Sequence, residues 1–321
     1  MNLCGMVQYN FLIKKYNKTK KLSNVEPWQI INYRDFSLKQ LFTGLNELIS
    51  ELNCDNFKDY ASKFESPESF AHNLSEVAPE NKEKIYLYIF ELWRRLVDKK
   101  TISIFCDELD HIIDDYNENK NTNEKIIYST LSDLIDILNY NVDIGENQNK
   151  MFACIKRHLS NKLESFICHF LHDQLNNGNK ESASELLHDF SDYIENNIWF
   201  DFLKIKKIET FASKSSVALM SSFLKNLHEK PNLDIYFDLL SHLITIGDYN
   251  LFADVCMESL KLIKNKEQFT KLLNIILDYY IINDMEKKEA LMKDLIKEME
   301  PTINNKKIKP SDKEKICNIL V

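Results

Sequence analysis

Apolar residues recur at three- and four-residue steps along most of this chain, which is the spacing of one face of an α-helix. The first clear stripe follows Ser37 and consists of Leu38, Leu41, Phe42, Leu45, Leu48, Ile49 and Leu52. Ser66 and Pro67 are a favoured N-cap and first helical residue, and Thr101 is a favoured N-cap for a helix over 102–116. Residues 85–97 are apolar nearly all round, which predicts a helix at the centre of its domain. The pattern predicts an all-α fold.

Beyond residue 122 the predicted helices become more regular in length and are joined by turns of a few residues. Short turns place neighbouring helices antiparallel, as helical hairpins. The predicted ranges are 122–140, 146–159, 161–177, 180–195, 198–211, 216–228, 232–246, 248–263, 266–282 and 285–299.

The polar stretch 117–122 is the best linker in the chain. It separates a smaller N-terminal helical domain from the regular hairpins, and both ends of the chain are less patterned. The predicted divisions are an irregular segment (1–35) with either a short helix or a short strand at 7–13, an N-terminal helical domain (36–117), a helical-repeat domain (122–301) and a charged C-terminal tail (302–321).

The regular part of the chain has a period of about 35 residues. Small or polar residues occupy the predicted turns at steps of 33 to 36 residues, namely Gly145, Gly178, Ser213, Gly247 and Asn283. Small residues early in the second helix of a hairpin follow the same period, namely Ala183, Ala218 and Ala253. Pro231 and Pro301 are expected to end two of the units, because proline cannot continue a helix.

Residues 236–260 resemble a tetratricopeptide repeat. They contain the aromatic residue and leucine of a first helix, then Gly247-Asp248-Tyr249, and then Ala253 one turn later. They depart from the pattern at Leu240, where a small residue is usual, and at Phe252, where alanine is expected.

Across 122–301 this resemblance is degenerate, and an unrelated helical bundle with the same rhythm is the alternative. The resemblance implies a right-handed superhelix of stacked hairpins whose concave face binds a peptide or a partner helix, with no chemistry of its own. The Asn/Lys/Ile-rich composition is also similar to that of effectors of intracellular bacteria and of the repeat proteins that restrain them. The apolar end, residues 316–321, weakly resembles a secretion signal.

The formal net charge of −8 and pI of about 5.6 oppose nucleic-acid binding, which requires neutralisation of phosphates. A lysine cluster near the N-terminus is expected to be a solvated tail, and consists of Lys14, Lys15, Lys18, Lys20 and Lys21. Seven cysteines without a C-x-x-C motif are typical of free thiols in a reducing compartment. No run approaches the ~18 apolar residues of a membrane span, and no signal peptide is recognised. We therefore expect a cytoplasmic protein, or one delivered into a host cell if the chain is an effector.

Four pairs of side chains have a spacing used by metal ligands on helices. They are Glu108/His111, Glu185/His188, Cys154/His158 and Cys168/His172. Helical projection places both Glu/His pairs on the face opposite the apolar stripe, toward solvent. The Cys/His pairs are interpreted as surface or boundary residues, so neither a metal nor a cofactor is expected.

These observations predict a non-catalytic scaffold or regulator that binds a protein or peptide through its helical repeats, and that regulates a bacterial effector. Two alternatives are an enzyme, with its active site between the helix at 85–97 and the acidic helix beside it, and a secreted effector acting on host proteins. The acidic run 107–115 is either a binding face for a basic segment or a solvated helix face. The candidate partner-binding residues are Tyr236, His242, Tyr249, Asp107 and Asp115.

Overall fold

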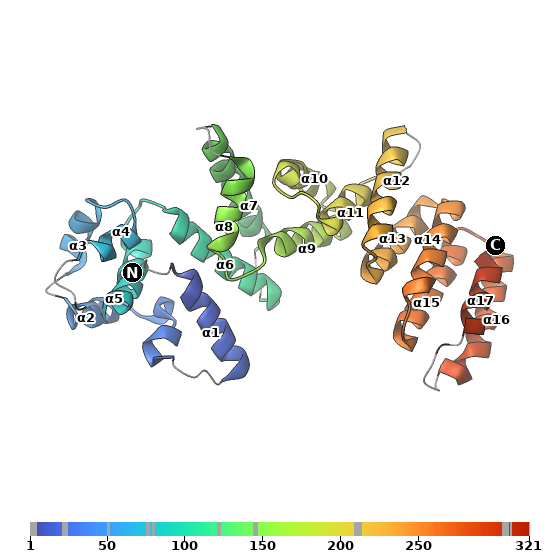
Figure 1. The fold of residues 1–321 in the computed structure, drawn as a ribbon, viewed down its shortest axis with the longest axis horizontal. Coiled ribbons are helices and arrows are strands. Elements are labelled where there is room, and N and C mark those ends of the chain that lie inside the picture. Colours follow the sequence, from blue (N-terminus) through green and yellow to red (C-terminus); the bar gives the residue numbers. More distant parts are fainter. Residues whose placement is uncertain are drawn as a thin grey trace. The chain divides into compact units, whose positions relative to one another are not determined.

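The structure is a computed structural model that describes residues 5–20, 25–49, 52–74, 78, 81–120, 123–143, 147–208, 214–303, 308 and 310–320 of the 321-residue chain. The prediction of an all-α fold is confirmed, since the described residues form α-helices and short 3-10 helices and no strand (Figure 1). The chain divides into two compact units, an N-terminal unit (1–167) and a C-terminal unit (168–321). The division falls inside helix α9 (Leu163–Asn176), later in the chain than the polar stretch 117–122.

Helix α5 (Lys82–Leu96) lies at the centre of the N-terminal unit, as its all-round apolar sequence predicts. Every residue from Ile85 to Trp93 is buried. The helices that pack against it are α2 (Leu38–Asn46), α3 (Cys54–Ala61) and α4 (Pro67–His72). A helix surrounded on several sides needs apolar residues on all of them, which explains the sequence of α5.

The start signals of three helices in this unit are confirmed. The side chain of Ser37 accepts a hydrogen bond from the backbone N–H of Gln40 (3.3 Å), and that of Ser66 accepts one from Ser69 (3.2 Å). Thr101 caps helix α6 (Ile102–Asn117) in the same way. Each cap satisfies a backbone donor that the first turn of a helix leaves without a partner.

Residues 1–35 are more regular than predicted, since the helix left open at 7–13 is present and longer, and further helical turns follow it in the described residues. The structure has helix α1 (Val7–Thr19) and the 3-10 helices η1 (Pro27–Ile30) and η2 (Tyr33–Asp35) in this segment. Helix α1 has a weak apolar stripe because part of its buried face is polar, including Asn10. The lysine cluster therefore lies largely on α1, and Lys14 forms an ion pair with Asp114 (2.9 Å) instead of belonging to a solvated tail.

Two further helices of the N-terminal unit, α7 (Glu124–Asp143) and α8 (Gln148–Arg157), pack against each other. Both lie close to their predicted ranges. Gly145, the predicted turn residue between them, is outside the described residues, as is Ser213, the turn residue predicted for a later hairpin.

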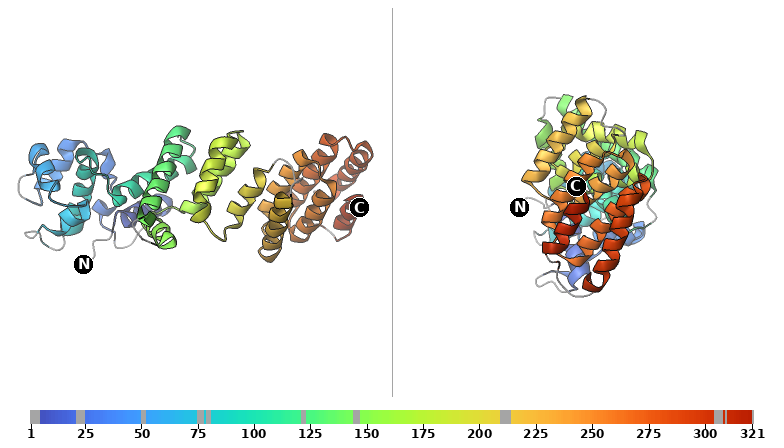
Figure 2. Two further views of the ribbon diagram at one scale, coloured as in Figure 1. Left: turned by 90° about the horizontal axis from the view of Figure 1, so that it is seen from above. Right: turned by 90° about the vertical axis from the view of Figure 1, so that its right-hand side faces the viewer.

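Three helical hairpins dominate the C-terminal unit. Their first helices are α11 (Ile198–Lys206), α13 (Leu233–Ile246) and α15 (Lys266–Ile282), and their second helices are α12 (Lys214–Glu229), α14 (Tyr249–Leu262) and α16 (Glu286–Ile303). The two helices of each hairpin pack together, and α11, α13 and α15 pack in series (Figure 2). Helix α10 (Lys180–Asp189) and the 3-10 helix η4 (Phe190–Asp192) precede them. This packing is compatible with a helical-repeat fold.

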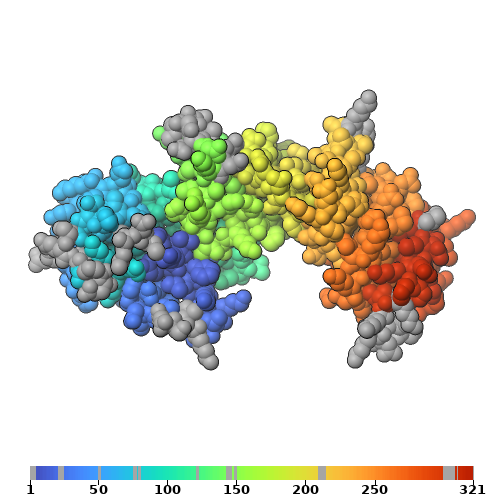
Figure 3. Space-filling model, viewed as in Figure 1, coloured from blue at the N-terminus to red at the C-terminus, as the bar shows by residue number. Residues whose placement is uncertain are grey.

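The C-terminal residues are not a charged tail. They form helix α17 (Pro310–Leu320), which packs against α14 and α16 (red in Figure 3). Ile316 and Leu320 are buried in the core of the unit, so the apolar residues of this segment have a structural use. Pro301 also differs from expectation, because α16 continues through it to Ile303.

The turn between α13 and α14 depends on Gly247. Its φ of +78° lies in the left-handed region, and its N–H donates to Leu243 O, which closes the last turn of α13. Asn283, the equivalent turn residue of the next hairpin, donates its side-chain amide to Ile244 O (3.2 Å) and Tyr279 O (3.0 Å). Two predicted turn residues therefore meet at the same helix end.

Replacing Gly247 with alanine is expected to destabilise the C-terminal unit by about 1–2 kcal/mol or more. The new Cβ would occupy a left-handed position and lie 2.9 Å from Asn283 Oδ1, so the amide of Asn283 would have to shift. Gly178→Ala is the matched control, because Gly178 has φ +84° but nothing within 4 Å of the added carbon. Urea unfolding followed by Trp199 fluorescence, with Trp28 and Trp93 replaced by phenylalanine, measures both variants. An equal loss of stability in the two would show that the contact with Asn283 contributes nothing.

Candidate functional site

A row of polar side chains crosses the first helices of the last two hairpins. On α13 it consists of Asp234, Asp238, Ser241 and Thr245, and on α15 of Glu267, Lys271, Asn274 and Asp278. In each helix the spacing is four, three and four residues, which keeps the side chains on one face. All eight are at least partly exposed, while the apolar residues between them are buried, apart from the half-buried Leu277. We call these eight residues the first-helix face.

A cluster of ionisable groups joins the first-helix face to the preceding helices. Lys206 Nζ on α11 lies 3.0 Å from His172 Nε2 on α9, and His172 Nε2 lies 3.7 Å from the carboxylate of Asp238 on α13. The side chains of His172 and Asp238 are 22% and 32% exposed, so both are reachable from solvent. On the other side, Lys271 Nζ lies 4.8 Å from the centroid of the Phe237 ring, within cation–π range.

Burial controls the protonation of this cluster. Burial lowers the pKa of His172 below its usual value, and the nearby Lys206 ammonium lowers it further, against the opposing effect of Asp238. Burial also lowers the pKa of Lys206. A neutral His172 can accept a hydrogen bond from the Lys206 ammonium, whereas a protonated His172 would place two cations next to each other.

Lowering the pH from about 7.5 to about 5.5 is expected to destabilise the C-terminal unit. His172 and His242 both have a folded pKa below the ordinary value of 6.5, and burial is the main cause for each. As the pH falls, the unfolded chain therefore binds protons first. The stability that depends on these two neutral histidines is fully present above about pH 6.5 and is lost as the pH falls toward their folded pKa values.

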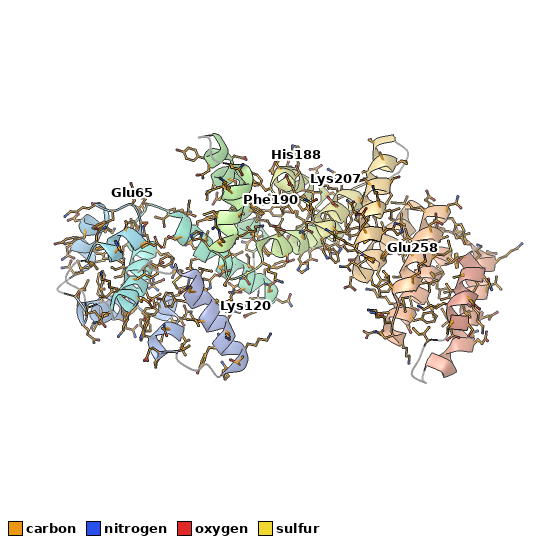
Figure 4. All side chains as sticks on the ribbon, in the orientation of Figure 1. Glu65, Lys120, His188, Phe190, Lys207 and Glu258 are labelled. Carbon is orange, nitrogen blue, oxygen red and sulfur yellow. The ribbon has the colours of Figure 1, made fainter. Side chains whose placement is uncertain are left out.

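The urea midpoint of Trp199 fluorescence at the two pH values, with Trp28 and Trp93 replaced by phenylalanine, measures this effect. His172→Gln should reduce the pH dependence, since glutamine does not titrate and still offers Lys206 an acceptor. His188→Gln, on the exposed face of α10 (Figure 4), is the matched control and should leave the pH dependence unchanged. An unchanged midpoint between the two pH values in the parent chain would contradict the argument.

The three candidate binding residues of the C-terminal unit have different positions. Tyr236 is buried in the core, so the prediction that it lies on a binding face is wrong: it belongs to the apolar side of α13. His242 is half-buried, and its Nε2 lies 3.2 Å from Ile208 O, next to the first-helix face. Tyr249 is half-buried; its hydroxyl donates to Leu320 O and accepts from Lys288, which attaches α17 to the last two hairpins.

The acidic run of α6 is neither a solvated face nor a fully exposed binding face. Asp107 is 3% exposed and accepts a hydrogen bond from Asn10 Nδ2 (2.8 Å) and an ion-paired one from Arg34. Asp110 is 1% exposed and accepts from the backbone N–H groups of Ser160 (3.1 Å) and Asn161 (3.0 Å). Asp107 is therefore unavailable to a partner, because buried carboxylates need such internal donors.

Other acidic residues of α6 line a cavity of about 660 Å³ in the N-terminal unit. The cavity is bounded by α1, the η1–η2 segment, α5 and the last turns of α6. Asp115 lies on its wall with a side chain 49% exposed and pairs with Lys120 (3.3 Å; Lys120 is labelled in Figure 4). His111 also lines it, so the prediction that the Glu108/His111 pair faces solvent is wrong for the histidine. The cavity lies between the two helices that the enzyme hypothesis named.

The remaining metal-ligand pairs are in different surroundings. Glu185 and His188 are exposed, as the helical projection predicts. Cys168 is buried, contrary to its interpretation as a surface or boundary residue, because α9 is buried over a wider arc than its apolar stripe indicates. Cys154 Sγ lies 4.0 Å from His158 Nδ1. Within the described ranges, no three His, Cys, Asp or Glu side chains gather as a metal site would require.

Comparison with known proteins adds no assignment: no protein-family model, no curated protein and no solved structure matches this chain. None of the helices in the described part of the chain has both the length and the apolar content needed to cross a bilayer.

Proposed function

We propose that the C-terminal unit is a non-catalytic scaffold that binds a protein or peptide partner across the first-helix face. The observation that carries this proposal is the packing of α13 against α15, the two helices that carry the first-helix face, in series with α11. Helical-repeat proteins bind partners on such surfaces, because each repeat adds a few side chains to one continuous face. The resemblance of residues 236–260 to a tetratricopeptide repeat supports the same use.

The charge of the face indicates the chemistry of the partner. Asp234, Asp238, Glu267 and Asp278 are carboxylates, and Lys271, the single lysine among the eight residues, lies against Phe237. A segment with basic side chains would complement this face. In this proposal the partner is regulated by being held, as the compositional similarity to proteins that restrain bacterial effectors implies.

The test is affinity purification of the tagged full-length chain from a lysate of the source organism, with crosslinking and mass spectrometry to locate the contact. Asp234→Lys combined with Asp278→Lys reverses two exposed charges of the first-helix face. Asp254→Lys combined with Asp294→Lys makes the same change of charge on the second helices α14 and α16. We expect one stoichiometric partner that the first pair abolishes and the control pair retains. A lack of any stoichiometric partner, or equal loss in both variants, would contradict the proposal.

A further inference from the structure

One lysine of the C-terminal unit has an imidazole as its hydrogen-bond partner. Lys206, at the end of α11, is half-buried, and its Nζ lies 3.0 Å from Nε2 of the half-buried His172. Lysines that lose contact with water are usually paired with a carboxylate. No carboxylate lies within 4.0 Å of Lys206 Nζ among the residues that the structure describes. The amine is therefore held by a group that can also take up its proton.

The surroundings of Lys206 disfavour its charged form. The ring of the fully buried Phe202 lies on one side, with its centroid 5.7 Å from Lys206 Nζ. Burial lowers the pKa of Lys206, against the opposing effects of nearby carboxylates. The titratable groups that face this amine come from α9 and α13 and are His172, Asp173, Asp238 and His242. A lysine with a larger neutral fraction is a better nucleophile, which is how lysines in apolar surroundings are activated.

His172 is placed to accept a proton from this amine. The 3.0 Å contact is within the hydrogen-bond reach that a general base needs, roughly 2.6–3.2 Å. On the other side of the ring, Nδ1 lies 3.8 Å from the carboxylate of Asp173 and 3.3 Å from the side-chain amide of Asn176. A carboxylate near Nδ1 favours the tautomer with its proton on Nδ1, which leaves Nε2 as the acceptor. Asp238 lies 3.7 Å from Nε2 and would stabilise the imidazolium that forms when Nε2 takes up a proton.

We propose that Lys206 is a nucleophile that accepts an acyl group from a small thioester. The neutral amine attacks the carbonyl carbon, the C–S bond breaks, and an amide forms at Nζ. The proton of the amine passes to His172 Nε2 and from there to the departing thiolate, which leaves as a thiol. A neutral donor suits this site, because the carboxylates of Asp173 and Asp238 flank the imidazole and would repel an anionic donor. Lys206 is not one of the eight residues of the first-helix face, so this reaction does not depend on partner binding there.

The rate of acetylation at each lysine tests the proposal. The full-length chain is incubated with the acetyl thioester of N-acetylcysteamine, a small neutral donor, and the products are located by mass spectrometry. Lys207 is the matched control, since it is the next residue along the chain and is exposed (Figure 4). At about pH 7 we expect Lys206 to react about tenfold faster or more, because each unit by which a lysine pKa falls makes the neutral amine about tenfold more abundant. Equal rates, or faster acetylation of Lys207, would overturn the proposal.

Two further measurements on the parent chain separate nucleophilicity from exposure and local sequence. Raising the pH to about 9.5 should reduce the ratio of the two rates, because an ordinary exposed lysine then also loses much of its proton. Unfolding in concentrated urea should make the two rates equal, because the contact with His172 is lost. A ratio that is independent of pH, or that persists in urea, would contradict the proposal.

His172→Gln tests the role of the imidazole. Glutamine still offers Lys206 an acceptor but does not take up a proton, so acetylation of Lys206 should slow about tenfold or more while that of Lys207 stays unchanged. His169→Gln, at an exposed position of the same helix, is the matched control and should leave both rates nearly unchanged. An unchanged rate at Lys206 in folded His172→Gln would overturn the proposal. If this variant does not fold, the pH and urea measurements on the parent chain still decide the question.

Discussion

Replacing Asp110 with alanine is expected to destabilise the N-terminal unit by about 3–5 kcal/mol, the usual cost of removing one member of a buried ionic network. The Asp110 carboxylate is 1% exposed and accepts hydrogen bonds from the backbone of Ser160 and Asn161 and from Asn161 Nδ2 (2.8 Å). Asn10 Nδ2 also donates to it (3.3 Å). Alanine would leave these donors without an acceptor and would free the turn between α8 and α9 from α6.

Unfolding of the N-terminal unit has to be followed separately, because a chain with two compact units need not unfold in one step. In a Trp199→Phe background, fluorescence reports only Trp28 and Trp93, which both lie in this unit. Asp115→Ala is the matched control on the same helix, since its half-exposed ion pair with Lys120 contributes about 0–1 kcal/mol. A similar loss for Asp110→Ala and Asp115→Ala would show that the buried network does not hold the unit together.

Helix positions in this chain are predictable because the spacing that encodes them is local. The range predicted for α15, 266–282, agrees with the structure at both ends, and α13 and α14 agree within one residue. Their N-caps Asn265, Asn232 and Asp248 are short polar side chains directly before an apolar stripe. The all-α class and the packed hairpins follow from such signals.

The polar network of the N-terminal unit was not predictable in the same way. Helical projection of α6 considers one helix only, and it places the acidic run opposite the apolar stripe. The donors that make burial of Asp107 and Asp110 possible come from Asn10, Arg34 and Ser160, which are far away in sequence. A burial argument based on hydrophobicity cannot find such partners. The sequence contains one indication of this burial. Asp107 and Asp110 lie on α6, the helix that follows the central apolar helix α5.

The cavity and helix α17 were missed for related reasons. The cavity wall combines side chains of α1 and η2, which lie in a segment predicted to be irregular apart from a short helix or strand at 7–13. The apolar residues of helix α17 lie only in its second half, after a charged first half, and Ile316 and Leu320 are buried because α17 packs against α14 and α16. In both cases the fold depends on contacts between distant segments, which periodicity does not encode.

Replacing Phe252 with alanine is expected to destabilise the C-terminal unit by about 3–5 kcal/mol, although alanine is what the tetratricopeptide pattern has at this position. Phe252 is fully buried early in α14, and its ring is stacked on Tyr279 of α15 with centroids 3.9 Å apart. Alanine would leave a cavity between α14 and α15 that the neighbouring side chains can fill only in part.

Urea unfolding read by Trp199 fluorescence, in a background with Trp28 and Trp93 replaced by phenylalanine, measures the stability of this unit. Phe252→Leu is the matched control and should lose much less, because most of the buried volume remains. The comparison separates two ways of joining hairpins. If alanine is tolerated to within about 1 kcal/mol, the helices can approach as in a tetratricopeptide repeat and the stacked rings are dispensable. A large loss would mean that α14 and α15 are held apart by aromatic side chains. The hairpins of this chain would then pack differently from those of a tetratricopeptide repeat.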